Sequence, residues 1–180
     1  MKNLLLLLSI FLSSLVYCQD NSIIVWEASN KLTWDDFQGA TDSKDKGFGD
    51  AITSYRIKII PEQVTVDKND IIQGEINITV QAEFDKKISW SLAKFDTVVL
   101  AHEQIHFDIA ELYARKIRMK FSENILAQKI TYNHFWIDYK ILWDECSIFQ
   151  KRFDSKTDHG RNNEQNKIWR QLVSEELRKH

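Results

Sequence analysis

The stretch LAHEQIHFDI, residues 100–109, places two histidines four positions apart, with a glutamate directly after the first. Four positions are about one turn of an α-helix, so His102 and His106 can present both imidazoles to a single ion. Zinc accepts such nitrogen ligands at about 2.0–2.1 Å. Glu103 lies about 100° around the helix from His102, where it can reach a water on the metal rather than the metal itself. The stretch therefore predicts a zinc site on a helix, with Glu103 as the general base.

A structural histidine pair is the competing interpretation, because this pattern arises by chance in about one chain in a hundred. Three features favour the metal site. The motif lies within a long stretch of helical periodicity, apolar residues flank it on both sides, and the chain begins with a leader typical of secreted proteins. A helix that carries a buried site needs apolar flanks of this kind.

A catalytic zinc site takes three protein ligands and a water, so the third ligand has to come from elsewhere in the chain. Asp108 and Glu111 are close in sequence but lie about 240° and 180° around the helix from His102, pointing away from the metal. Arg115 follows Glu111 by four residues, which predicts an ion pair between them instead.

His159 is the predicted third ligand. It lies in FDSKTDHGRN, a turn between two apolar segments, where Gly160 lets the backbone bend over the first helix. His134 is typical of a surface or capping position, and the terminal His180 is expected to fray. The carboxylates that remain as alternatives are Asp154, Asp158 and Glu145. Asp158 is also a candidate acceptor for an imidazole N–H, a contact that fixes the tautomer of a metal ligand.

The first half of the chain has the pattern of β-strands. Residues 51–60 alternate polar and apolar side chains, which indicates a half-buried strand ended by Pro61. Further strand pattern covers residues 23–26, 64–66 and 71–85, with a turn at 67–70. A strand within 71–84 is a candidate to pair with an extended peptide. Trp34 and Phe37 are expected to anchor the segment between the first strands.

From about Asp96 the apolar spacing changes to three and four, which predicts helices. Asp96 or Thr97 can cap the first helix, which should reach Ser122 or beyond. A second helix is expected from about Tyr132, broken across residues 154–160. Its expected core face is Phe135, Tyr139, Leu142, Cys146, Phe149 and Phe153. A third helix is expected over residues 163–177, and its expected inward residues are Ile168, Trp169, Leu172 and Val173.

Strands followed by helices predict an α+β fold, with an antiparallel β-rich half over residues 19–92 and three helices within 93–180. About 160 residues after the leader suit a single domain with its own core. The single cysteine left after the leader, Cys146, leaves no pair for an internal disulfide.

The leader consists of Lys2 followed by an apolar run over residues 4–16, too short for a comfortable membrane span. Cleavage after Cys18 is expected to release a secreted or periplasmic chain without stable membrane insertion. Lipid attachment at Cys18 is the alternative, but Tyr17 is bulky where such sequences have a small residue. The formal charge of the whole chain is −2, and removal of Lys2 makes it −3, which is no nucleic-acid footprint.

HEQIHFDIAELYARKIR, together with LTWDDFQG and FDSKTDHGRNNEQNKIW, resembles an uncharacterised bacterial family described as predicted secreted zinc-dependent proteases. The resemblance covers nearly the whole chain after the leader. It implies a zincin-like domain with Zn²⁺ as cofactor and a peptide or protein as substrate. The family's motif falls on His102, Glu103 and His106 here, and its downstream turn falls on His159.

A secreted zinc metallopeptidase is therefore the expected function. Zinc would polarise the scissile carbonyl and acidify a water, while Glu103 takes the proton and passes it to the leaving amine. Candidate groups to stabilise the oxyanion are Tyr132, Tyr139 and Asp158. The alternative function is a non-catalytic secreted metal-binding or interaction module that keeps the same fold. Substrate specificity and oligomeric state have no marker in the sequence.

Overall fold

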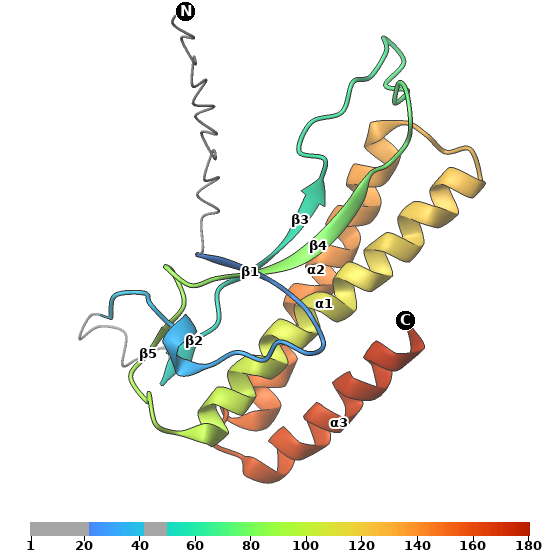
Figure 1. The fold of residues 1–180 in the computed structure, drawn as a ribbon. Helices are drawn as coiled ribbons and strands as arrows, with labels where there is room; N and C mark the ends of the chain where they lie inside the picture. Colours follow the sequence, from blue (N-terminus) through green and yellow to red (C-terminus); the bar gives the residue numbers. More distant parts are fainter. Residues whose placement is uncertain (1–21, 42–49) are drawn as a thin grey trace, which may run out of the picture.

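The computed structural model describes residues 22–41 and 50–180, so the predicted leader and Cys18 lie outside the described residues. Its elements in chain order are β1 (Ile23–Val25), the 3₁₀ helix η1 (Trp34–Asp36), β2 (Ala51–Ile52), β3 (Tyr55–Ile60), β4 (Thr79–Asp85), β5 (Trp90–Ser91), α1 (Thr97–Leu126), α2 (Tyr132–Thr157) and α3 (Asn163–Lys179). The predicted order, strands first and three helices after them, is confirmed (Figure 1). None of the helices in the described part of the chain is long and apolar enough to cross a membrane.

Three antiparallel strands in the order β1-β4-β3 form a small sheet that packs on α1 (Figure 1). Alternate side chains of β4 face the helix, and Val80, Ala82 and Phe84 are at most 2% exposed. Phe84 meets Phe107 of α1, with ring centroids 5.8 Å apart. Full burial of large apolar side chains such as these stabilises by about 1.5–3 kcal/mol each. This contact therefore holds the sheet firmly against the helix that carries the two histidines.

The helix α1 is the central element, in contact with the sheet on one side and with α2 and α3 on the others. Asp96 is its N-cap, and its carboxylate accepts from the backbone N–H groups of Val98 and Val99. Such a cap satisfies donors that the first helical turn leaves free. The expected start at Asp96 or Thr97 and the extension beyond Ser122 are both confirmed.

The helix α2 continues past the predicted break at residue 154 and ends only at Thr157. No glycine or proline interrupts it before Gly160, and the Thr157 hydroxyl bonds back to the carbonyl of Phe153 within the last turn. Asp154 therefore lies on the helix, four residues after Gln150, and not in a loop. The predicted core face of α2 is confirmed, because all six of its residues belong to the core or pack against it.

The helix α3 buries Trp169 and Val173, as predicted, but leaves Ile168 49% and Leu172 41% exposed. The helix faces the core through residues spaced three and four apart, beginning at the buried Asn166. Ile168 and Leu172 each lie one position before a residue of that stripe and so fall beside it. The prediction that these two side chains point inward is wrong.

The strands differ from the predicted pattern in three places. Residues 64–66 form no strand, and among them only Val66 makes an isolated bridge, to Ile72. The run 51–60 forms two strands, β2 and β3. β2 pairs with β5 and β3 pairs with β4, and between them the backbone N–H of Ser54 bonds to the side chain of Ser89. The run 71–85 becomes a strand only at Thr79, after a turn around Gly74, whose φ is +80°. β4 is also the central strand, paired on both edges, so it has no free edge for a peptide.

Candidate metal centre

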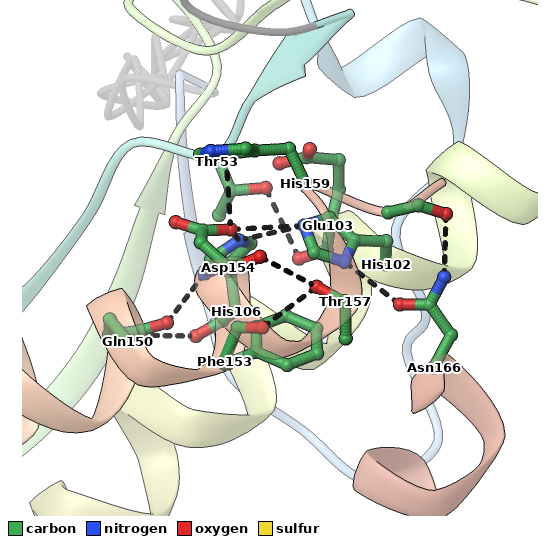
Figure 2. Close-up of polar contacts among 11 residues, drawn as sticks. Thr53, His102, Glu103, His106, Gln150, Phe153, Asp154, Thr157, His159 and Asn166 are labelled. Atoms are coloured by element: carbon green, nitrogen blue, oxygen red, sulfur yellow. Dashed lines mark hydrogen bonds and ion pairs between the residues drawn. The ribbon is translucent and has the colours of Figure 1, made fainter. Parts of the chain in front are cut away.

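The side chains of His102 and His106 of α1 point toward the same spot (Figure 2). The Nε2 atoms of His102 and His106 lie 3.1 Å apart. His102 is 3% exposed, and the side chain of His106 is 12% exposed. The one-turn spacing in the sequence therefore does bring both imidazoles together, as predicted.

Asp154 of α2 completes a group of three possible metal-binding side chains. Its Oδ1 lies 3.2 Å from Nε2 of His102 and 2.9 Å from Nε2 of His106. The three atoms thus form a triangle with edges of 2.9–3.2 Å. Ligand atoms on a tetrahedral zinc with bonds of about 2.0–2.1 Å are about 3.3 Å apart. The triangle matches three corners of such a site to within a few tenths of an ångström.

Two buried amides determine which nitrogen of each histidine carries the proton. Nδ1 of His102 lies 3.1 Å from Oδ1 of Asn166, and the amide nitrogen of Asn166 donates to the carbonyl of Gly160. Nδ1 of His106 lies 2.5 Å from Oε1 of Gln150, and the amide nitrogen of Gln150 donates to the carbonyl of His106. Because both amides present oxygen to the rings, each Nδ1 carries the proton and donates.

It follows that both Nε2 atoms carry lone pairs, and that these face each other and the carboxylate oxygen of Asp154. Three acceptors at such distances repel one another unless a cation or a proton lies between them. The amide partners also hold the rings in place, as the outer contacts of metal-binding histidines do. The donor set and its outer partners therefore fit a divalent metal that accepts nitrogen and oxygen.

In the metal-free protein, protons serve the same electrostatic purpose. Burial opposes ionisation of Asp154, but the hydrogen bonds from His102 and His106 outweigh it and hold the pKa of the carboxyl well below its usual range. Burial also disfavours the charged form of His106, yet the bond to Asp154 and the nearby Glu103 charge raise the pKa of that imidazole. The three side chains thus favour positive charge between them.

The packing around His102 leaves little freedom. Its ring stacks on Phe153, with centroids 4.4 Å apart and the planes 23° from parallel. On another side Gly160 approaches so closely that a Cβ there would lie 3.1 Å from Cγ of His102. Gly160 also has a φ of +89°, at the end of a run of left-handed residues that begins at Asp158. Two features therefore favour glycine at this position: the close approach to His102 and the positive φ.

His102, His106 and Asp154 line a cavity with a volume of about 260 Å³, and Glu103 lines it as well. Glu103 is 4% exposed, and within residues 22–41 and 50–180 its Oε2 has no hydrogen-bond partner. Thr53 holds the backbone at this point by donating to the Glu103 carbonyl. A buried carboxylate oxygen without a donor is costly, and such groups occur where chemistry needs them.

The structure places the other predicted site residues as follows. His159 lines the cavity, but its side chain is 55% exposed and its Nδ1 lies 3.9 Å from Oδ1 of Asp154, so it is not in the three-residue group. Its backbone is left-handed, with a φ of +50°. Asp158 is exposed at the end of α2, and the imidazole N–H groups bond to Asn166 and Gln150 instead. Glu145 is exposed and outside the group.

The remaining predictions concern residues around the motif. Asp108 and Glu111 do point away from the histidines, and Glu111 pairs with Arg115 as predicted. The Tyr139 hydroxyl donates to the carbonyl of Ile57, and Tyr132 lines a different cavity near Pro61. Neither phenol lines the cavity of Glu103. The tyrosine that does line it is Tyr55, which the sequence did not single out.

The cavity thus combines three side chains that could hold a metal ion, a buried carboxylate oxygen without a hydrogen-bond donor, and space for a small group beside them. No protein-family model, curated protein or solved structure matches this chain. Any proposal for the function therefore rests on the chemical groups in the cavity.

Proposed function

We propose that the protein is a secreted zinc metallopeptidase in which His102, His106 and Asp154 hold the metal and Glu103 is the general base. The observation that carries the proposal is the set of three lone-pair atoms 2.9–3.2 Å apart, in a cavity that also contains the unpartnered Oε2 of Glu103. Zinc held by two imidazoles and a carboxylate would polarise a peptide carbonyl and lower the pKa of a water. Asp154 takes the position for which His159 was predicted.

The residues of the chain have separate roles in this mechanism. Glu103 accepts a proton from the attacking water and passes it to the leaving amine, since no other donor competes for its Oε2. Gln150 and Asn166 keep the imidazoles in the tautomer that leaves Nε2 free to bind. Phe153 packs against both rings and excludes water from beneath them.

The arrangement supports a zincin-like fold, with the motif on a helix below an antiparallel sheet and the last ligand on a later helix. The peptide substrate is placed along β2, because Ala51, Ile52 and Thr53 line the cavity beside Glu103. Within the described residues β2 pairs with β5 on one edge. Its other edge is the one that an extended peptide would use.

The test combines metal content with hydrolysis. Wild-type protein should contain one zinc per chain by elemental mass spectrometry and should cleave casein or members of a fluorogenic peptide library. The Glu103→Gln variant should keep the zinc and lose at least about a hundredfold in kcat/KM, the usual scale for a general base. Glu123→Gln is the control on the same helix, because the exposed Glu123 pairs with Lys120 and lies outside the cavity. Wild-type protein that binds zinc but cleaves no peptide would contradict the peptidase and support the non-catalytic module.

A further inference from the structure

A second cavity lies apart from the one that the histidines line. It has a volume of about 530 Å³ and lies between α1, α3 and the segment that follows β1. Its α1 residues include Ala101, Gln104, Ile105 and Asp108, which occupy a different face of the helix from His102, Glu103 and His106. Sites for small molecules have volumes of about 300–1,000 Å³. The size of this cleft thus suits a small organic molecule, bound independently of the proposed metal.

The interior of the cleft is mostly apolar. Ile105 and Ala101 of α1 face Leu177 of α3, and Trp26 covers one side. The indole is fixed in place, because its Nε1 donates to Oδ1 of Asp108 over 2.8 Å. Arg115 lies over the ring at 5.2 Å from its centroid, which adds a cation–π contact. The indole is therefore a preformed wall of the cleft rather than a mobile surface side chain.

The charges around the cleft are strongly unequal. Four cations line it, namely Lys31, Arg115, Arg170 and Arg178, against the single carboxylate of Asp108. Asp108 is already engaged by Trp26, Gln104 and Lys31. Arg115 is engaged by Glu111 and by the carbonyl of Leu177.

The two arginines of α3 are not neutralised. Within residues 22–41 and 50–180, no carboxylate lies within ion-pair distance of Arg170, and the guanidinium of Arg178 contacts only the hydroxyl of Ser174. Arg170, Ser174 and Arg178 recur every four residues and so face the cleft from one side of the helix. They present two unpaired guanidinium groups, about 12 Å apart along the axis, beside an apolar interior.

We propose that this cleft binds an organic anion with an apolar body, of the size of a medium-chain acyl or an aryl carboxylate. The apolar body lies against Trp26, Ile105 and Leu177, and the anionic group bonds to a guanidinium of α3. Guanidinium groups form paired, charge-assisted hydrogen bonds with carboxylates, whereas a neutral or cationic amphiphile of the same length gains nothing from them. The concave shape on three sides favours a small molecule over a protein surface, since protein interfaces are broad and flatter.

The experiment uses the full chain and the fluorescent sulfonate 1-anilinonaphthalene-8-sulfonate as the probe. Decanoate should displace the probe at concentrations at least about tenfold lower than decanol or decylamine, because only decanoate supplies the anionic group. The Arg170→Gln or the Arg178→Gln variant should lose about tenfold in decanoate affinity, while Arg152→Gln on α2 should not. Arg152 is an exposed arginine that does not line the cleft, so it matches the change in charge.

A second pair of variants separates the cleft from loosely packed apolar surface. Ser174→Trp fills the cleft from an exposed position of α3 and should abolish decanoate binding, whereas Gln171→Trp on another face of the helix should leave it unchanged. Near-ultraviolet circular dichroism verifies that both variants are folded. Equal affinity for decanoate and decanol would overturn the proposal, as would displacement that survives Ser174→Trp. Zinc content and peptidase activity are separate readouts, so failure here leaves the proposed function intact.

Discussion

Two buried glutamates of α1, eight residues apart, have opposite surroundings. Glu111 is 6% exposed, and its Oε1 accepts from Arg115 at 2.8 Å and from Arg118 at 2.6 Å. Glu103 is 4% exposed, and no cation lies within ion-pair distance of it in the described part of the chain. The same residue type at the same depth on the same helix is thus neutralised in one place and left unpaired in the other.

The two surroundings differ in whether the buried carboxylate has a partner. Around Glu111 both arginines donate to Oε1, and Arg118 extends the network to the carbonyl of Val80 in the sheet. Around Glu103 the neighbouring groups are the acceptors of His102, His106 and Asp154, which face one another. A paired carboxylate needs no further partner, whereas acceptors that face one another need a proton or a cation between them.

The largest effect is expected on zinc affinity, and it tests whether His102, His106 and Asp154 bind a metal together. Asp154→Asn should weaken zinc binding by more than about a hundredfold, because loss of a direct ligand should exceed the 10–100-fold cost of losing an outer partner. His159→Ala should weaken it by less than about tenfold, since His159 lies at the rim. Isothermal titration with zinc measures both. The reverse ranking would restore His159 as the third ligand and exclude Asp154.

A somewhat smaller effect is expected at the amides that orient the rings. Gln150→Leu removes the acceptor for Nδ1 of His106 and should lower zinc affinity by about 10–100-fold. Gln150→Glu keeps an acceptor at that point and should retain most of the affinity. Equal losses in the two variants would show that Gln150 acts through packing alone and not through the tautomer of His106.

The two glutamates should respond in opposite directions when each becomes glutamine in metal-free protein. Glu111→Gln leaves Arg115 and Arg118 without their carboxylate and should destabilise the fold by about 2 kcal/mol, since both arginines remain partly exposed. Glu103→Gln removes an unpaired buried charge and should leave the free energy of unfolding unchanged or higher. Urea titration of both variants tests this. A large loss of stability for Glu103→Gln would mean that this glutamate is structural as well.

The smallest expected effect concerns pH. The raised pKa of His106 and the lowered pKa of Asp154 stabilise the metal-free protein between about pH 4 and 6.5, and this contribution is lost as the pH rises through the folded pKa of His106. Protons and zinc compete for the same Nε2, so zinc affinity should fall about tenfold per pH unit below that pKa. The rise in melting temperature on adding zinc should therefore grow from pH 6 to pH 8. A pH-independent rise would remove His106 from the ligand set.

The sequence alone was sufficient to predict α1 and the closeness of the residues in its local motif. His102, Glu103 and His106 need only the helical repeat to come together, and the Glu111–Arg115 pair follows from the same repeat. The position of Asp154, the proposed third ligand, depends on where α2 ends. The polar stretch from Asp154 to Gly160 has the composition of a turn, but packing of Phe153 and the Thr157 hydroxyl bond keep it helical for one more turn.

The outer partners of the histidines could not have been predicted from one sequence. Gln150 and Asn166 are ordinary amides on different helices, and only the packing of α2 and α3 against α1 brings them to the two rings. The one marker available was the spacing of Gln150 and Asp154, four apart beside the predicted core face of α2. Likewise the late start of β4 follows from the turn at Gly74, which the alternation of residues 71–85 does not reveal.

The thiol of Cys146 shares its side of α2 with Gln150 and Asp154, at successive intervals of four residues. It is fully buried, and burial raises its pKa to about 12. A thiol reagent can therefore reach it only during excursions that lift α2 from the core, and the labelling rate counts those excursions. A bound ion would hold Asp154 in place, two turns further along the same helix. Binding of the ion should therefore slow the rate at which a thiol reagent modifies Cys146. The labelling rate of Cys146 would then report binding of the proposed metal without an added probe in the cavity.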